Sequence, residues 1–292
     1  MAHVEYEPFC LDYYSTSVLA LPRFFANSRS YSEINLFQLS IITINFNNRE
    51  GLSKTFQSIR KIKNDQIEYI VIDAMSSDGS GELIKENEEW IDLSVVESDK
   101  GIYDGMNKGI ALASGQYCIF INSGDLLVDT EILQHIEKTK AMDIVYGNTL
   151  VHYDSGFERI AKAVPVSEIW KSLPFIHQSV WVKTDILKQE LFDLNYKFCS
   201  DYESFCRLES KKYSFKQIDY TIAQIEAGGL SDEKRDEATA EVFEISKKYR
   251  NLSEEQIKWF KKEIRKGKKV QAIKKWVPKS LIKFALKMKY RK

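Results

Sequence analysis

Cysteine, long apolar runs and basic residues near the start are all scarce in this chain of 292 residues. Its four cysteines show no Cys-x-x-Cys spacing, so we interpret them as free thiols in a reducing cytosol. No apolar run reaches the roughly 18 residues of a membrane-spanning helix. Residues 1–20 carry acids where a secretory signal peptide has basic residues. The sequence therefore predicts a cytoplasmic protein without a transmembrane helix.

The charge is unevenly distributed, although the formal net charge is zero. From Lys258 to Lys292 the chain has 15 basic residues and one acid, Glu263, which gives this tail a charge of +14. The remaining residues therefore carry −14. The chain thus has an acidic body, residues 1–257, and a basic tail, residues 258–292.

The regular part of the chain starts at Leu39. Residues 1–38 show no sustained period, and we assign them to an N-terminal extension without chemistry. Apolar, β-branched runs then alternate with segments of helical period. We expect strands at 39–46, 68–73, 93–97 and 117–121, and helices at 51–63, 81–90 and 102–113. This order predicts an α/β fold with a mostly parallel central sheet flanked by helices.

After Gly147 the pattern becomes irregular. Short apolar pieces lie among turns, and Pro165 and Pro174 interrupt them. We expect strands at 143–146, 149–153, 160–164, 179–182, 215–218 and 222–225, with helices at 130–140 and from Cys199 to about Lys212. This half is predicted to be partly antiparallel and to cover the first sheet. We place the catalytic domain at residues 39–231 and a charged helical extension at 232–292.

The stretch from Tyr117 to Asp125 is where ligand chemistry is first expected. An apolar run stops abruptly at the polar turn Asn122-Ser123-Gly124-Asp125. Ligands of open α/β sheets bind at the carboxyl ends of strands, and a hard cation prefers oxygen ligands. The alternative is an ordinary turn, because turns favour these residue types.

Two other places allow both a binding and a purely structural interpretation. Asp73 ends the second strand, where it could bind a ligand or cap the loop of residues 76–80. The helix at 102–113 carries Tyr103, Asp104, Asn107 and Lys108. Asp104 and Lys108 are four residues apart, which fits either a surface ion pair or a face toward a ligand.

Several segments together indicate a family: IITINFNN, VIDAMSSDGS, SDKGIYDGMNKGIALASG and YCIFINSGD, followed by HQS, SDYE and GGLS. Between about Leu39 and Ser231 the chain resembles the family 2 inverting glycosyltransferases of the GT-A fold. Within that family it is similar to the bacterial branch that builds O-antigen, capsule and colanic-acid polysaccharides. The resemblance implies transfer of a hexosyl unit from a nucleoside-diphosphate sugar, with a UDP-sugar favoured.

The resemblance also implies the donor site. Asp73 would receive the base through a ring N–H, and the glycine loop at Gly228, Gly229 and Ser231 would close on the diphosphate. The remaining nucleotide-sugar contacts would come from Thr43, Asn45, Asn47, Asp99, Lys100, Gly101, Asn107, Lys108, Asn122 and Ser123.

The turn at residues 122–125 occupies the place of the family's DxD motif, but it departs from that pattern. Asn122 and Gly124 stand where carboxylates are common, so only Asp125 is expected to bind the metal. One carboxylate with diphosphate oxygens and water can still hold Mg²⁺ or Mn²⁺.

The resemblance assigns the chemical step to residues further along the chain. Asp201 matches the general base, with Glu203 as a reserve, and His177 matches a position near the acceptor. Alternatively, Asp201 places charge at a helix N-terminus, and His177 is structural. The implied reaction is a single in-line displacement with inversion at the anomeric carbon.

The basic tail alternates lysine and arginine with Trp259, Phe260, Trp276 and other apolar residues. This composition favours amphipathic helices on an anionic membrane surface, which would suit a lipid-linked glycan acceptor. A solvated helix or a nucleic-acid patch is the alternative, and no nucleic-acid motif accompanies the tail.

Two other functions remain open at this point. A metal-dependent nucleotidyltransferase would show a Gly-rich basic loop after its first strand, and residues 45–48 are not that loop. A binding module that lost activity along with its carboxylates would lack metal-dependent turnover of nucleotide sugars.

Overall fold

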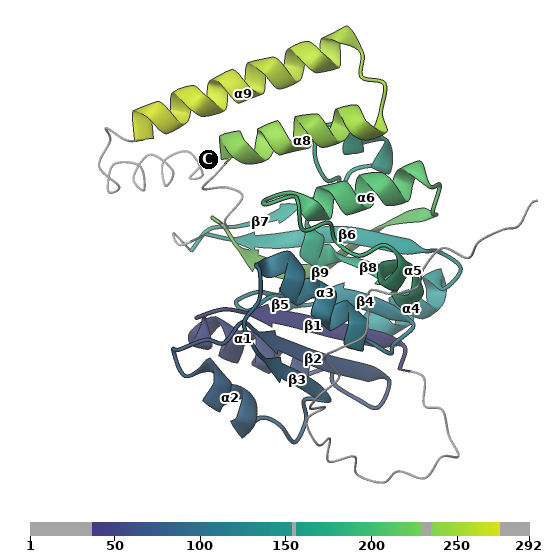
Figure 1. The fold of residues 1–292 in the computed structure, drawn as a ribbon. Helices are drawn as coiled ribbons and strands as arrows, with labels where there is room; N and C mark the ends of the chain where they lie inside the picture. The colour runs from purple at the N-terminus through teal and green to yellow at the C-terminus, as the bar shows by residue number, and fades with distance from the viewer. Residues whose placement is uncertain (1–36, 154–155, 229–234, 275–292) are drawn as a thin grey trace, which may run out of the picture. The chain divides into compact units, whose positions relative to one another are not determined.

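The computed structural model of the chain describes residues 37–153, 156–228 and 235–274 (Figure 1). Most of the expected N-terminal extension, the loop residues Gly229 and Ser231, Cys10 and the tail from residue 275 lie outside the described residues.

The first half alternates strands and helices as predicted. Its strands are β1 Leu39–Asn45, β2 Ile67–Asp73, β3 Leu93–Val96, β4 Tyr117–Phe120 and β5 Leu126–Leu127. Its helices are α1 Arg49–Arg60, α2 Ser80–Glu86, α3 Ile102–Leu112 and α4 Ile132–Thr139. Strand β1 pairs in parallel with β2 and β4, and β2 pairs in parallel with β3.

The second half adds strands to the same sheet. Its strands are β6 Ile144–His152, β7 Glu158–Ala161, β8 Val180–Lys183 and β9 Phe215–Glu226. Its helices are η1 Val166–Trp170, η2 His177–Ser179, α5 Thr184–Gln189, α6 Ser200–Ser210, α8 Arg235–Tyr249 and α9 Glu254–Lys274.

The sheet order is β3-β2-β1-β4-β8-β6-β9-β5, with β7 paired to β6. Strand β8 is antiparallel to both β4 and β6, whereas β6 and β9 are parallel. The prediction that the second half covers the first sheet is therefore wrong, because this half continues the sheet sideways. The pieces at 143–146 and 149–153 form the single strand β6, and those at 215–218 and 222–225 form β9. Register shifts between β6 and β9 explain the interrupted apolar pattern.

Apolar residues cover both faces of the sheet, as a parallel centre requires. In β1, Ile42 and Ile44 belong to the core under α3 and α6, while Leu39 and Ile41 belong to the core under α1. Helix α3 lies so close to β1 that a Cβ at Gly109 would come within 2.5 Å of the Ile42 side chain, which only glycine avoids. This close packing fixes the position of α3 and of the polar residues at its start.

Helices α8 and α9 run beside each other above α6 (Figure 1). Phe260 of α9 is fully buried, and its ring lies 4.8 Å from Phe243 of α8 and 6.0 Å from Trp170 of η1. The expectation that Phe260 faces a membrane is therefore wrong. None of the described helices is long and apolar enough to cross a membrane.

Candidate functional site

The carboxyl ends of β1 and β2 meet in a network around Asp73, which is fully buried. Its Oδ1 accepts hydrogen bonds from Asn45 Nδ2 at 2.6 Å and Ser76 Oγ at 2.7 Å, and its Oδ2 accepts one from Ser76 N at 2.8 Å. Asp73 thus caps the following loop, the structural role considered above. Asn45 Oδ1 is buried and has no hydrogen-bond partner within the described ranges.

Thr43 and Asn47 have different surroundings. Thr43 is fully buried, donates to the Ile121 carbonyl at 2.7 Å and accepts from the Tyr69 hydroxyl at 3.0 Å. Through the bond to the Ile121 carbonyl, Thr43 holds the backbone that follows β4. Asn47 is exposed and accepts from Ser77 N at 2.8 Å, which joins the two loops beside the sheet edge.

The turn at residues 122–125 is held by α1. Asp125 N donates to the Asn122 carbonyl at 2.9 Å, and Gly124 has a φ of 99°. Glycine adopts this angle readily and other residues rarely do, which explains why no carboxylate stands at position 124. Thr55 Oγ1 donates to the Asp125 carbonyl at 2.8 Å and accepts from Gly124 N at 3.0 Å. Asn48 Nδ2 donates to the Ser123 carbonyl at 2.9 Å.

Asp125 points its carboxylate toward the residues just before β8. Gln178 Nε2 donates to Asp125 Oδ2 at 2.7 Å. Burial raises the pKa of Asp125 from 3.8 to about 7; the Gln178 hydrogen bond opposes the rise and the charge of Glu226 adds to it. A desolvated carboxylate next to a second one favours a cation.

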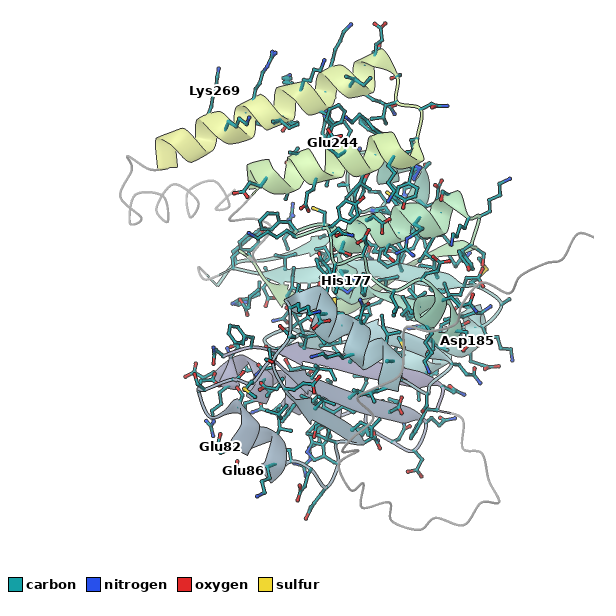
Figure 2. All side chains as sticks on the ribbon, viewed as in Figure 1. Glu82, Glu86, His177, Asp185, Glu244 and Lys269 are labelled. Carbon is teal, nitrogen blue, oxygen red and sulfur yellow. The ribbon has the colours of Figure 1, made fainter. Side chains whose placement is uncertain are left out.

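His177 precedes Gln178 and lies inside the protein (Figure 2). Its ring stacks on Phe120 at 5.2 Å and contacts Phe192 and Phe205 edge-on. Only 8% of the residue is exposed, and neither ring nitrogen has a hydrogen-bond partner within the described ranges. Burial lowers the pKa of His177, and the charge of Asp201 opposes this. The imidazole is therefore neutral near pH 7.

Asp201 lies in the first turn of α6. Its Oδ1 accepts hydrogen bonds from the Tyr103 hydroxyl at 3.1 Å and from Tyr202 N at 2.8 Å. The Phe192 ring contacts both His177 and Tyr103, and the Tyr103 hydroxyl is bonded to Asp201, so a chain of contacts connects Asp201 with the His177-Gln178 pair and with Asp125.

Glu203 occupies a different environment from its neighbour Asp201. It is 1% exposed, accepts from Arg207 Nη2 at 3.2 Å, and is bonded to the Tyr249 hydroxyl. Lys248 Nζ lies 3.4 Å from its Oε1. Glu203 therefore fastens α8 to α6, which leaves Asp201 as the base candidate.

The start of α3 is tied internally. Asp99 Oδ1 accepts from Gly101 N at 2.9 Å, and Lys100 N donates to Asp104 Oδ2 at 3.0 Å. The expected ion pair of Asp104 and Lys108 is present at 3.7 Å, and Lys108 also pairs with Glu97 at 2.8 Å.

Asn107 uses its side chain to hold the loop before α6. Its Nδ2 donates to the Phe192 carbonyl and its Oδ1 accepts from Phe192 N, both at 2.9 Å. Asn107 and Lys108 are thus engaged within the protein, and contact with a ribose or phosphate would come in addition to these bonds.

Sequence reasoning missed several residues that shape the site. Gln178 was within reach, because it stands inside the HQS segment that indicated the family. Asn48 was within reach for the same reason, because it ends the IITINFNN segment. Thr55 and Glu226 gave no signal, since α1 and β9 reach the turn only through the tertiary fold.

The donor set suits one cation with few protein ligands. The described residues contain no group of three or more His, Cys, Asp or Glu that could hold a metal ion. Asp125 offers a carboxylate, and Asn122 Oδ1 is a buried oxygen without a hydrogen-bond partner from the described residues. These residues fit Mg²⁺ or Mn²⁺ completed by diphosphate and water oxygens.

Comparison with known proteins assigns the chain to a family. The model of glycosyl transferase family 2 matches residues 40–196, just over half of the chain. The chain belongs to glycosyl transferase family 2. The matched range contains β1 from its second residue on, the whole of β2, β3 and β4, the turn at residues 122–125 and His177.

Individual relatives are similar to this chain over part of its length. The chain is 32% identical over 133 residues to an uncharacterized glycosyltransferase of Mycobacterium tuberculosis, covering 45% of this chain and 43% of that protein. It is 29% identical over 90 residues to a putative teichuronic acid biosynthesis glycosyltransferase of Bacillus subtilis, covering 30% and 36%. The matches thus span less than half the length of these two relatives.

Solved structures show the same GT-A glycosyltransferase fold. TarS of S. aureus in complex with UDP-GlcNAc matches with a TM-score of 0.55 at 15% identity, covering 74% of this chain and 68% of that one. The mannosyltransferase PcManGT of Pyrobaculum calidifontis, in complex with GDP-Man and Mn²⁺, matches with a TM-score of 0.56 at 14% identity, covering 74% and 65%.

The raised pKa of Asp125 predicts a pH-dependent stability effect of Asp125→Asn in EDTA. The folded-state pKa of about 7 exceeds the ordinary 3.8, so wild-type stability falls as pH rises through this window. The variant lacks this charge. The melting temperature of Asp125→Asn minus that of the wild type should therefore increase as the pH rises from about 4 to about 8.

Asp185→Asn, which neutralises an exposed carboxylate on α5, is the matched control. Because Asp185 is exposed, the melting temperature of this variant should not show the same pH-dependent gain over the wild type. If the melting-temperature difference between Asp125→Asn and the wild type does not change over this pH range, the raised pKa of the buried Asp125 carboxylate is contradicted.

Proposed function

We propose that this protein is an inverting glycosyltransferase that moves a sugar from a nucleoside-diphosphate sugar, with a UDP-sugar favoured, to a hydroxyl group of a glycan acceptor. One observation carries the proposal: a chain of contacts connects Asp125 to Asp201 through Gln178, its neighbour His177, Phe192 and Tyr103. Asp125 is bonded to Gln178, and Asp201 acts electrostatically on His177. Family membership supports this arrangement of a donor side and an acceptor side.

On the acceptor side, Asp201 takes the proton from the attacking hydroxyl group. The hydroxyl oxygen forms a bond to the anomeric carbon as the bond from that carbon to the diphosphate oxygen breaks. Nucleoside diphosphate leaves from the opposite face, so the configuration inverts. Neutral His177 lines this region without adding charge.

On the donor side, Asp125 and Asn122 would hold a divalent cation. When bound, such a cation supplies Lewis-acid stabilisation of the charge on the leaving diphosphate. Gln178 orients the Asp125 carboxylate, and α1 fixes the turn through Thr55.

We also propose a role in bacterial surface polysaccharide synthesis on a lipid-linked acceptor. The resemblance to that branch and the teichuronic acid relative support this role. Membership of glycosyl transferase family 2 disfavours the nucleotidyltransferase alternative. Measured turnover of a nucleotide sugar would distinguish an active enzyme from an inactive binding module.

The test is a panel of UDP- and GDP-sugars, incubated with Mg²⁺ or Mn²⁺ and saccharide acceptors, with products measured by mass spectrometry. We expect metal-dependent transfer from one donor class. Asp201→Asn should lower kcat by about a hundredfold or more, since general bases contribute on this order.

Asp185→Asn removes a carboxylate on the outside of α5 and should keep full activity. Transfer that survives Asp201→Asn would refute the assigned base. A protein that binds nucleotide sugars without any turnover would support the binding module instead.

We further propose that the outer side of α9 contacts an anionic membrane. Its lysines 258, 261, 262, 266, 268 and 269 are exposed, and Lys269 points away from α8 (Figure 2). Because Phe260 packs inward, this contact is electrostatic rather than inserted. Basic residues near an anionic leaflet contribute about 1 kcal/mol each.

Charge reversal tests this contact. The triple variant Lys261→Glu, Lys262→Glu and Lys268→Glu should reduce co-sedimentation with phosphatidylglycerol-containing vesicles by about tenfold or more. Binding of the wild type should weaken as salt rises.

The matched control reverses three exposed lysines on other helices, Lys54, Lys85 and Lys138, and should bind like the wild type. Equal loss in both triple variants would show non-specific charge attraction and would overturn the proposed surface.

A further inference from the structure

Tyr103 links the two sides of the site. It stands in the first turn of α3, two residues after Gly101, and its hydroxyl lies 3.1 Å from Asp201 Oδ1. We propose that Tyr103 is a positioning residue, which holds the Asp201 carboxylate in the orientation that removes the acceptor proton. This inference rests on the proposed function.

The mounting of Tyr103 is rigid. The turn before it is fixed by the hydrogen bonds of Asp99 and Asp104 to backbone N–H groups. Helix α3 lies so close to β1 that a Cβ at Gly105 would come within 3.1 Å of the Ile44 side chain. The tyrosine ring itself packs against Phe192, with ring centroids 5.6 Å apart. The hydroxyl therefore occupies a defined position relative to the donor-side turn.

The tyrosine hydroxyl acts as a donor. Burial, with the Asp201 charge adding to it, raises the pKa of Tyr103 far above its usual range, so the phenol keeps its proton. Two acceptors lie within reach: Asp201 Oδ1 at 3.1 Å and the Phe198 carbonyl at 2.9 Å. One proton is shared between the base and the loop that precedes it.

The loop before α6 has a separate anchor, so Tyr103 is not needed to hold its backbone. Glu241 of α8 accepts hydrogen bonds from the N–H groups of three consecutive residues, Lys197, Phe198 and Cys199, at 2.9 to 3.0 Å. Losing the Tyr103 hydroxyl should therefore leave the loop in place and free the Asp201 side chain to rotate.

The hydrogen bonds of Asp201 leave one oxygen available. Both donors, Tyr103 and the backbone N–H of Tyr202, bind Oδ1. Within the described ranges no residue donates a hydrogen bond to Oδ2, which can therefore accept the proton. Orientation of a reacting group matters because small misplacements can lower rates by about a hundredfold.

The test replaces Tyr103 with Phe, which keeps the ring and removes the hydroxyl. We expect kcat for transfer to fall about tenfold or more, while KM and Kd for the donor stay within about twofold of the wild type. A purely structural tyrosine would not change kcat alone in this way.

Tyr202→Phe is the matched control one residue from the base. The Tyr202 hydroxyl bonds the Ile169 and Trp170 carbonyls and Ser246, but not Asp201. This variant should lose stability, measured as melting temperature, at least as much as Tyr103→Phe, yet keep kcat.

Three outcomes overturn the inference. If both Phe variants lower kcat in proportion to their loss of melting temperature, Tyr103 is structural. If Tyr103→Phe keeps wild-type kcat while Asp201→Asn abolishes transfer, positioning is refuted and the proposed function stands. If Asp201→Asn keeps transfer, the assigned base is refuted and this inference with it.

Discussion

The antiparallel pairing of β8 with β4 is the constraint on which the site depends. Ile119 lies opposite Trp181, so the chain leaving β4 and the chain entering β8 meet at one edge of the sheet. Asp125 follows the first and His177-Gln178 precedes the second. A parallel neighbour would bring the opposite end of its strand to this edge. The change of strand direction at this point therefore creates the contact between Asp125 and Gln178.

Buried polar groups in the site lower the free energy of unfolding, and the apolar core must offset this loss. Asp125 is desolvated near Glu226, and His177 is buried among three aromatic rings with both nitrogens unpaired within the described ranges. Unpaired buried polar groups are unfavourable, and they concentrate where ligands complete the contacts. The surrounding structure is correspondingly rigid: Thr55 and Asn48 hold the turn, and Gly105 and Gly109 seat α3 against β1. The cation of the proposed reaction would offset the negative charge at Asp125.

The parallel half of the fold could be predicted from the sequence because its signals are local. Strand β1 is a continuous apolar run, and polar turns follow each of the parallel strands β1, β2 and β4. The mixed half could not, because β6 and β9 pair with register shifts, and alternation breaks at each shift. Among site residues, the motif positions Asp125, His177 and Asp201 are connected through contacts of Gln178, Phe192 and Tyr103. Thr55 and Glu226 could not be found, since their roles come from strand order rather than from spacing.

The central claim is that Asp125 serves the donor and Asp201 the acceptor. Isothermal titration of nucleoside diphosphate with and without Mn²⁺ tests this division most directly, in the wild type, Asp125→Asn and Asp201→Asn. The account predicts that Asp125→Asn loses the metal-dependent part of the affinity, while Asp201→Asn keeps the wild-type Kd. Equal loss in both variants, or unchanged metal-dependent affinity in Asp125→Asn, would contradict it.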